Sequence, residues 1–376
     1  MSNFLINASG LKAGGGLQVA DSVCCELNNF PDHRFVVVLS QYLQETAKRI
    51  VNYRNVEVVF YDLPNHNLRL LLTGRDKLLD SLVMERKINA VMSFFGPNLW
   101  VPRCPHLSGF ARAHLVMPES PYYKRMPVLK RIKEFWMNKV LKYYFKKSSK
   151  VFYTESPAIS ERLMRLIPGI TVHTVTNNYN QVFDYPEKWK RKELPVFDGK
   201  TFLCISSPYP HKNLAIALDI AKIWNKYKPD FRFRFVYTIN ASDFPEITDE
   251  LASHFLFIGK IDVSECPSLY EQCDVVFQPS LLECFTATYP EAMRMRKPIV
   301  TTDMEFAKGI CENAACYYSA IDAEEASKAL YKVANDVEYA HKLVNNGDRQ
   351  LLKFDDYKQR AVKLINILKE ISNNIK

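Results

Sequence analysis

The sequence predicts an α/β protein with two doubly wound parallel sheets, one in each of two domains. The chain has 376 residues, of which 47% are hydrophobic, so it is long and apolar enough to bury two ordinary cores. Short apolar runs alternate with helical patterns, which is typical of βαβ crossovers and therefore of parallel sheets. The alternation occurs twice, before and after a polar stretch at residues 186–200.

The first half opens with an apolar run, a glycine turn at residues 14–16 and an amphipathic helix. The turn lacks the GxGxxG spacing of a dinucleotide site and the Lys-Ser/Thr of a Walker loop, so neither kind of site is favoured. The runs that we expect to form strands span residues 3–9, 34–40, 56–63, 88–96, 151–156 and 170–178. Helical patterns include residues 17–29 and 77–87.

The second half repeats the pattern after the polar stretch. Its expected strands span residues 201–207, 231–239, 254–261, 275–280 and 298–303, and its helices include residues 213–227, 266–273 and 288–296. We therefore expect an N-terminal Rossmann-like domain, a linker, a C-terminal Rossmann-like domain and a final helix. Their predicted bounds are 1–185, 186–200, 201–352 and 353–376.

Two glutamates with seven residues between them lie in the expected βα unit "LLECFTATYPEAMRMRKPIVTTD", residues 281–303. Glu283 falls in the loop and Glu291 near the start of the helix. Such loops lie at the carboxyl ends of the strands, where ligands bind in open α/β sheets. A carboxylate only accepts hydrogen bonds, which suits paired hydroxyls, and a sugar nucleotide has hydroxyls on both sides of its diphosphate. The alternative is that Glu291 caps its helix and Glu283 is an ordinary loop residue.

Four blocks in order carry a resemblance to a known family. They are "CISSPYPHKNL" (204–214), "HFLFIGKI" (254–261), "LYEQCDVVFQPSLLECFTATYPEAM" (269–293) and "KPIVTTD" (297–303). This set resembles the C-terminal half of the retaining glycosyltransferases of family 4, which carry a Glu-x7-Glu motif. The resemblance implies the GT-B fold, in which two Rossmann-like doubly wound parallel-sheet domains face each other across a cleft. It also implies that the C-terminal helix crosses back to the N-terminal domain.

The resemblance assigns roles to three charged residues. It implies that Glu291 accepts from the ribose hydroxyls of a nucleotide diphosphate sugar, the donor substrate, and Glu283 from hydroxyls of the transferred sugar. Lys212 matches the lysine that neutralises the β-phosphate as the glycosidic bond breaks, which stabilises the transition state. The alternative for Lys212 is an exposed lysine at a helix start.

Two departures from the family pattern affect donor binding. Ser207 stands where the family usually has an arginine, so phosphate binding is expected to be weaker or to be helped from elsewhere. Glu283 is followed by Cys284, Phe285 and Thr286 rather than Gly-Phe-Gly. The loop must then use ordinary φ and ψ values, since glycine alone readily adopts positive φ. We count Ser207, Phe285 and Thr286 as donor-binding residues, and Thr286 could also cap the following helix.

The N-terminal half offers fewer candidates. By the resemblance, Gly15 and Gly16 line the cleft against the donor phosphates or the acceptor, although they could form a simple tight turn. Family members often place a histidine against the donor sugar, and we prefer His114 to His106, although either could be structural. No catalytic base is assigned, because in these enzymes the leaving phosphate is thought to take the acceptor proton.

Positive charge gathers in one stretch, residues 124–150. It holds ten of the 50 Lys and Arg residues and one of the 41 acids, so it carries the whole net charge of +9. Ile132, Phe135 or Trp136, Val140 and Tyr143 or Tyr144 form one helical stripe, which suits an anionic membrane surface. The alternative is a stripe that faces the domain core. Nucleic acid is not expected as a partner, because no binding motif for it is found.

These observations predict a metal-independent, hexosyltransferase-like retaining glycosyltransferase. The sequence has no Asp-x-Asp motif of the kind that holds a metal on a diphosphate, and no cofactor is expected. Nine cysteines without metal spacing, and the lack of a signal peptide or spanning segment, favour the cytoplasm at the inner face of a membrane. The expected acceptor is a lipid-linked glycan of bacterial surface polysaccharide synthesis, such as O-antigen or capsule. A non-catalytic scaffold and a sugar-nucleotide epimerase of the same fold are the alternatives.

Overall fold

The computed structural model describes residues 2–12, 14–64, 68–97, 99–245 and 247–373. The chain forms two compact units. Unit 1 consists of residues 1–118, 126–177 and 355–376, and unit 2 of residues 119–125 and 178–354. The short segment 119–125 therefore belongs to unit 2, although both of its flanks belong to unit 1.

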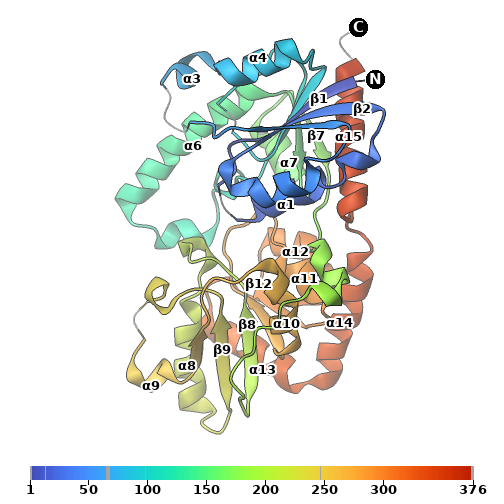
Figure 1. Cartoon of the computed structure of the whole chain (residues 1–376). Coiled ribbons are helices and arrows are strands. Elements are labelled where there is room, and N and C mark those ends of the chain that lie inside the picture. Colours follow the sequence, from blue (N-terminus) through green and yellow to red (C-terminus); the bar gives the residue numbers. More distant parts are fainter. Residues whose placement is uncertain (1, 13, 65–67, 98, 246, 374–376) are drawn as a thin grey trace. The chain divides into compact units, whose positions relative to one another are not determined.

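Unit 1 contains a seven-stranded sheet in the order β3-β2-β1-β4-β5-β6-β7. Strands β1, β2 and β7 of this sheet are labelled in Figure 1. Every neighbouring pair is parallel. The order reverses between β1 and β4, which is the switch point of a doubly wound sheet. The strands are β1 (Ser2–Ala8), β2 (His33–Leu39), β3 (Val56–Phe60), β4 (Ala90–Ser93), β5 (His106–Gly109), β6 (Val151–Thr154) and β7 (Thr171–Thr174).

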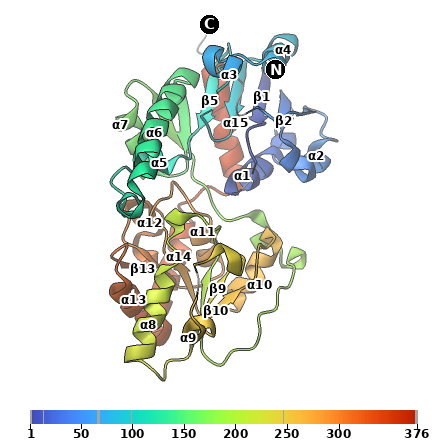
Figure 2. The ribbon, with the colours of Figure 1, turned by 90° about the vertical axis from the view of Figure 1, so that its left-hand side faces the viewer.

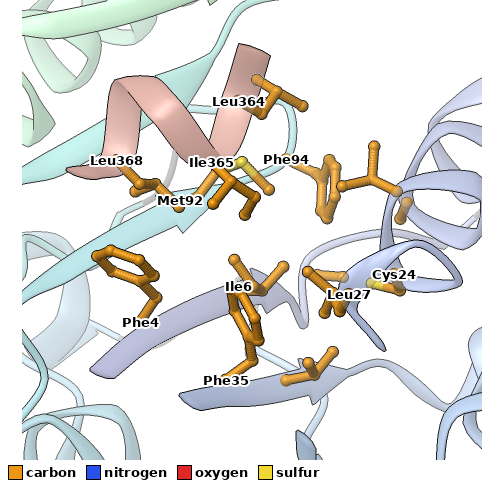
Figure 3. Packing of buried hydrophobic residues seen from close by; sticks show 14 of the residues in the cluster. Phe4, Ile6, Cys24, Leu27, Phe35, Met92, Phe94, Leu364, Ile365 and Leu368 are labelled. Carbon is orange, nitrogen blue, oxygen red and sulfur yellow. The ribbon is translucent and has the colours of Figure 1, made fainter. Parts of the chain in front are cut away.

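The helices of unit 1 include one from the far end of the chain. Helix α15 (Tyr357–Asn373) contacts β4, β5 and α1. Its apolar residues recur at helical spacing, and Leu364, Ile365 and Leu368 pack with Phe4 and Met92 in the core (Figure 3). The other helices are α1 (Gly15–Cys24), α2 (Gln44–Ile50), α3 (Leu68–Thr73), α4 (Lys77–Glu85), α5 (Ala113–Val116), α6 (Val128–Ser148) and α7 (Pro157–Leu166).

Unit 2 contains a six-stranded parallel sheet in the order β10-β9-β8-β11-β12-β13. The prediction of two doubly wound parallel sheets is therefore confirmed. The strands are β8 (Lys200–Cys204), β9 (Phe233–Tyr237), β10 (Phe255–Phe257), β11 (Val275–Gln278), β12 (Ile299–Thr302) and β13 (Ala315–Tyr318). The helices are α8 (Ile216–Tyr227), α9 (Asp249–Ala252), α10 (Cys266–Glu271), α11 (Thr288–Arg294), α12 (Glu305–Cys311), α13 (Ala323–Asn335) and α14 (Val337–Leu351).

Helix α6 runs along the outside of unit 1 (Figure 2) and is mostly exposed. Its buried residues are Phe145 and Ser148. The apolar stripe lies on the other side of the helix, where its members are between 50% and 64% exposed: Ile132, Phe135, Trp136, Val140 and Tyr143. The alternative that this stripe faces the domain core is therefore wrong. On the buried side, Phe145 packs against Phe110 and Phe152 of unit 1.

Among the helices of the described ranges, none is both long enough and apolar enough to cross a membrane.

Candidate functional site

The candidate site lies at the switch point of the unit 2 sheet. Strands β8 and β11 are neighbours there, and the order reverses between them. The loop after β8 ends in a short 3-10 helix, Pro210–Lys212, and the loop after β11 spans residues 279–287. The backbone N-H of Leu281 donates to the carbonyl of His211 at 2.8 Å, which ties the two loops together. Ligands of doubly wound sheets bind at this position.

Lys212 and Glu283 come together across these two loops. Lys212 Nζ forms an ion pair with Glu283 Oε1, and the two side chains are 13% and 11% exposed. The alternative that Lys212 is an exposed lysine at a helix start is therefore wrong. The pair places a hydrogen-bond donor with positive charge beside an acceptor with negative charge, both reachable from solvent. Those are the groups that a ligand with phosphates and hydroxyls requires.

Glu291 is held by a residue that the sequence did not reveal. The carboxylate is 5% exposed, and Tyr270 Oη donates to Glu291 Oε2 at 2.9 Å. Burial raises the pKa of Glu291 to about 7. The N-cap of α11 is Ala287 and has no side-chain cap hydrogen bond, so the alternative that Glu291 caps the helix is wrong. Tyr270 lies at an apolar position of α10, and nothing in the sequence sets it apart from a core residue.

The loop after Glu283 uses ordinary backbone angles, as predicted from its lack of glycine. Of the described residues with positive φ, none lies between 279 and 288. The prediction that Thr286 caps α11 is wrong, because Ala287 already has helical angles and occupies the N-cap. Thr286 Oγ1 instead donates to Thr288 Oγ1 at 3.4 Å. The ring of Phe285 packs edge-on against Phe354, with centroids 6.4 Å apart.

Ser207 lies in the exposed part of the loop after β8. Its carbonyl accepts from the backbone N-H of Tyr209 at 2.8 Å and from Ser206 Oγ at 3.2 Å. The side chain at this position is a neutral hydroxyl, so the exposed loop carries no charge there.

The two histidines of unit 1 differ in their surroundings. Both ring nitrogens of His106 have partners, the Ser148 carbonyl at 2.8 Å and Ser93 Oγ at 2.9 Å, and burial lowers its pKa to about 4. His106 is therefore a structural histidine. His114 lies on α5 with Nδ1 3.4 Å from Glu134 Oε1 of α6, and its side chain is 21% exposed.

The glycine turn of unit 1 follows β1 at the switch point of that sheet. Gly14, the N-cap of α1, has a φ of 75°, which side chains rarely adopt. A Cβ on Gly15 would meet nothing within 4 Å, whereas one on Gly16 would lie 3.3 Å from the side chains of Leu11 and Phe95. Gly15 therefore leaves open space at the start of α1.

Segment 119–125 packs onto both loops of the candidate site, and sequence patterns gave no sign of this. Ser120 Oγ donates to the carbonyl of Leu281 at 2.7 Å. The ring of Tyr122 stands edge-on to His211 with centroids 6.1 Å apart. Arg125 Nη1 donates to Asn213 Oδ1 at 2.7 Å. The segment is thus fixed at three points beside Lys212.

Part of the chain resembles a known protein family. Residues 186–350 match the profile of the family described as "Glycosyl transferases group 1". No curated protein sequence is significantly similar to the chain.

Solved structures resemble the chain over nearly its whole length. Sucrose-phosphate synthase from Thermosynechococcus elongatus has a TM-score of 0.70 and 12% identity, covering 99% of both chains. Anabaena HepE, in complex with UDP and glucose, has a TM-score of 0.69 and 14% identity, covering 98% of this chain and 99% of HepE. A glycosyltransferase from Rickettsia africae ESF-5 has a TM-score of 0.70 and 14% identity, with 99% of both chains covered. At these identities the likeness shows the fold, which is GT-B.

The profile match and the four sequence blocks fall on the same part of the chain, the part that builds the loops around Lys212, Glu283 and Glu291. Residues 186–350 are thus similar to the group 1 glycosyl transferases, and the two sheets have the GT-B fold.

Proposed function

We propose that the protein is a retaining glycosyltransferase that moves a sugar from a nucleotide diphosphate sugar to a hydroxyl group of a glycan. The observation that carries this proposal is the placing of Lys212, Glu283 and Glu291 at the switch point of unit 2. An ammonium group can bind a phosphate, and two carboxylates can accept from the hydroxyl groups that a nucleotide diphosphate sugar carries on either side of its diphosphate. HepE was solved with UDP-glucose, which makes a uridine nucleotide the first donor to test.

In this proposal each charged residue binds one part of the donor. Glu291 accepts from the ribose hydroxyls, and Glu283 from hydroxyls of the transferred sugar. Lys212 exchanges its ion pair with Glu283 for the β-phosphate. As the bond between the sugar and the β-phosphate breaks, negative charge grows on the leaving oxygen, and the ammonium stabilises that charge most in the transition state.

The transfer step needs no protein base. The anomeric carbon forms its new bond to the acceptor oxygen on the face that the phosphate leaves, and the acceptor proton passes to the leaving phosphate oxygen. Metal independence is part of the proposal and rests on the sequence, which has no Asp-x-Asp motif. The roles of His114, Gly15 and Gly16 toward the donor or acceptor stay predictions from the family resemblance.

The acceptor that we propose is a lipid-linked glycan of bacterial surface polysaccharide synthesis, reached from the inner face of a membrane. The support is α6, whose exposed stripe is lined by lysines. Lys139 Nζ lies 5.3 Å from the ring centroid of Phe135, and Lys147 Nζ 5.8 Å from that of Tyr143. Aromatic rings suit the headgroup region of a bilayer and lysines suit anionic lipids. Such a face would hold the enzyme where a lipid-linked acceptor is found.

Calorimetric titration with UDP, GDP and ADP, without added metal, tests the donor site. We expect one nucleotide to bind selectively and to bind less tightly to the Lys212→Ala and Glu291→Ala variants, provided that both are folded. Intact protein that binds none of the three would contradict the proposal and favour a non-catalytic scaffold.

The epimerase alternative is tested on the donor alone. When the protein is incubated with the nucleotide sugar and no acceptor, an epimerase changes the configuration of the sugar, whereas a transferase does not. A changed sugar in this experiment would replace the transferase proposal.

A further inference from the structure

The charges within the candidate site do not favour a diphosphate. Lys212 is the cation at its centre, and Glu283 already neutralises it. Glu291 adds a second carboxyl group, while Ser207 and Thr286 carry neutral hydroxyls. Both phosphates of a nucleotide diphosphate sugar are negatively charged, so the site as built from these two loops would attract them weakly. A further cation beside Lys212 would make the charge of the site more positive and so strengthen its attraction for the phosphates.

Arg125 is placed to supply that charge. It is exposed, and Nη1 donates to the side chain of Asn213, the residue that follows Lys212. Asn213 is buried, so its side chain is enclosed by its neighbours on most sides. This bond uses one of the five N-H donors of the guanidinium. Among the described residues Arg125 makes no further hydrogen bond, so its other donors are available to an anion.

The segment that carries Arg125 is anchored independently of that bond. Ser120 holds the carbonyl of Leu281, and the ring of Tyr122 packs on His211. Leu281 lies in the loop of Glu283, and His211 directly precedes Lys212. The segment is therefore held by contacts to both loops, and its guanidinium is bonded to the residue next to Lys212. Less conformational entropy is lost when such a side chain binds.

We infer that Arg125 is a further phosphate-binding residue, which holds the β-phosphate of the donor together with Lys212. This inference rests on the proposed function of the site. The planar fork of a guanidinium matches two phosphate oxygens, and a hydrogen bond between charged groups is among the stronger ones in proteins. A segment from the first half of the sequence would thus provide the charge that Ser207 does not.

The test compares UDP with UMP, which lacks the β-phosphate, in binding to intact protein and to an Arg125→Gln variant. Glutamine can still donate an N-H to Asn213 Oδ1 but carries no charge. We expect the variant to lose about 10- to 100-fold in affinity for UDP, the range for a hydrogen bond between charged groups, and less than about 2-fold for UMP. If GDP or ADP is the nucleotide that binds, its own monophosphate takes the place of UMP.

Two further variants complete the design. Lys124→Gln removes the neighbouring exposed charge and should change UDP affinity by less than about 2-fold, and Arg125→Lys should recover part of the loss. An Arg125→Gln protein that binds UDP as tightly as the intact protein, or that loses UDP and UMP affinity equally, would overturn the inference and leave the transferase proposal standing. Intact protein that binds no nucleotide diphosphate would instead overturn the proposed function.

Discussion

Lys212 Nζ and Glu283 Oε1 form an ion pair that joins the loop after β8 to the loop after β11. Each side chain is nearly buried, so removing one leaves the charge of the other without a partner. The pair therefore has a structural effect as well as the role in catalysis that we propose. Those two effects can be separated by experiment.

Lys212→Ala should lower kcat by about 100- to 1000-fold, the effect of removing one donor that stabilises charge in a transition state. Because Lys212 acts mainly as charge develops, KM should change much less. Steady-state kinetics with the nucleotide sugar identified by titration checks this. Lys222→Ala is the matched control, since Lys222 is an exposed lysine of α8 that pairs with Asp219. A loss confined to KM would assign Lys212 to ground-state binding only.

The same pair predicts a coupling in stability. Lys212→Ala and Glu283→Ala should each lower the free energy of unfolding by about 1–3 kcal/mol, the cost of a buried polar group left unpaired. The double variant should lose less than the sum of the two. Urea unfolding of the four proteins measures the difference, and strict additivity would mean that the pair is not formed in solution.

Glu291 should make stability depend on pH. Burial raises its pKa from 4.5 to about 7, so between these values the folded chain holds a proton that the unfolded chain has released. The protonated Glu291 therefore contributes fully to stability below pH 4.5, and this contribution is lost as the pH rises through 7. The free energy of unfolding should fall by about 3 kcal/mol over this range. Glu291→Gln should flatten this fall in urea unfolding between pH 5 and 7.5. An unchanged slope would show that Glu291 is ionised throughout.

Through its hydrogen bond to Glu291, Tyr270 should affect the pH at which the affinity for the nucleotide increases. The ionised carboxylate accepts hydrogen bonds at both oxygens, so affinity should increase as the pH rises through about 7. Tyr270→Phe removes the hydroxyl that favours ionisation, and the midpoint of this increase should move to higher pH. Tyr237→Phe is the control, because Tyr237 is a buried tyrosine of the same unit whose hydroxyl bonds to the Leu214 carbonyl. A shift in both variants would point to a general loss of packing.

The exposed stripe of α6 should act in binding and not in folding. The double variant Ile132→Ser, Trp136→Ser should leave the melting temperature unchanged but reduce sedimentation with vesicles containing phosphatidylglycerol. Phe145→Ala, on the buried side, should cost about 3–5 kcal/mol. Met84→Ser changes an equally exposed apolar residue of α4 and should not affect vesicle binding. Equal vesicle binding by all of the exposed variants would contradict a membrane role for α6.

Sequence patterns predicted the parts of the site that depend on chain position. Lys212 and Glu283 each follow a recognisable strand, and the rule that parallel strands end at one edge places both in the same region. Patterns could not identify Ser120, Tyr270 or Arg125, whose importance comes from contacts between segments distant in the chain.

Two alternatives needed burial to be decided. His106 and His114 look alike in sequence, and only the partners on both ring nitrogens identify His106 as structural. The stripe of α6 has helical spacing whether it faces a core or solvent, because periodicity defines a face and not its neighbour. Exposure of Trp136 decided that question.

The chain leaves unit 1 after Asn177 and returns to it at Asp355. The two crossing points lie together, because Thr176 Oγ1 donates to the Asp355 carboxylate at 2.9 Å. A ribosome therefore finishes all of unit 2 before it makes α15, whose Leu364 and Leu368 complete the core of unit 1. Until then the apolar residues of unit 1 that pack against α15, such as Phe4 and Met92, lack that cover. The synthesis of α15, rather than that of any one strand, is the event that allows unit 1 to finish folding.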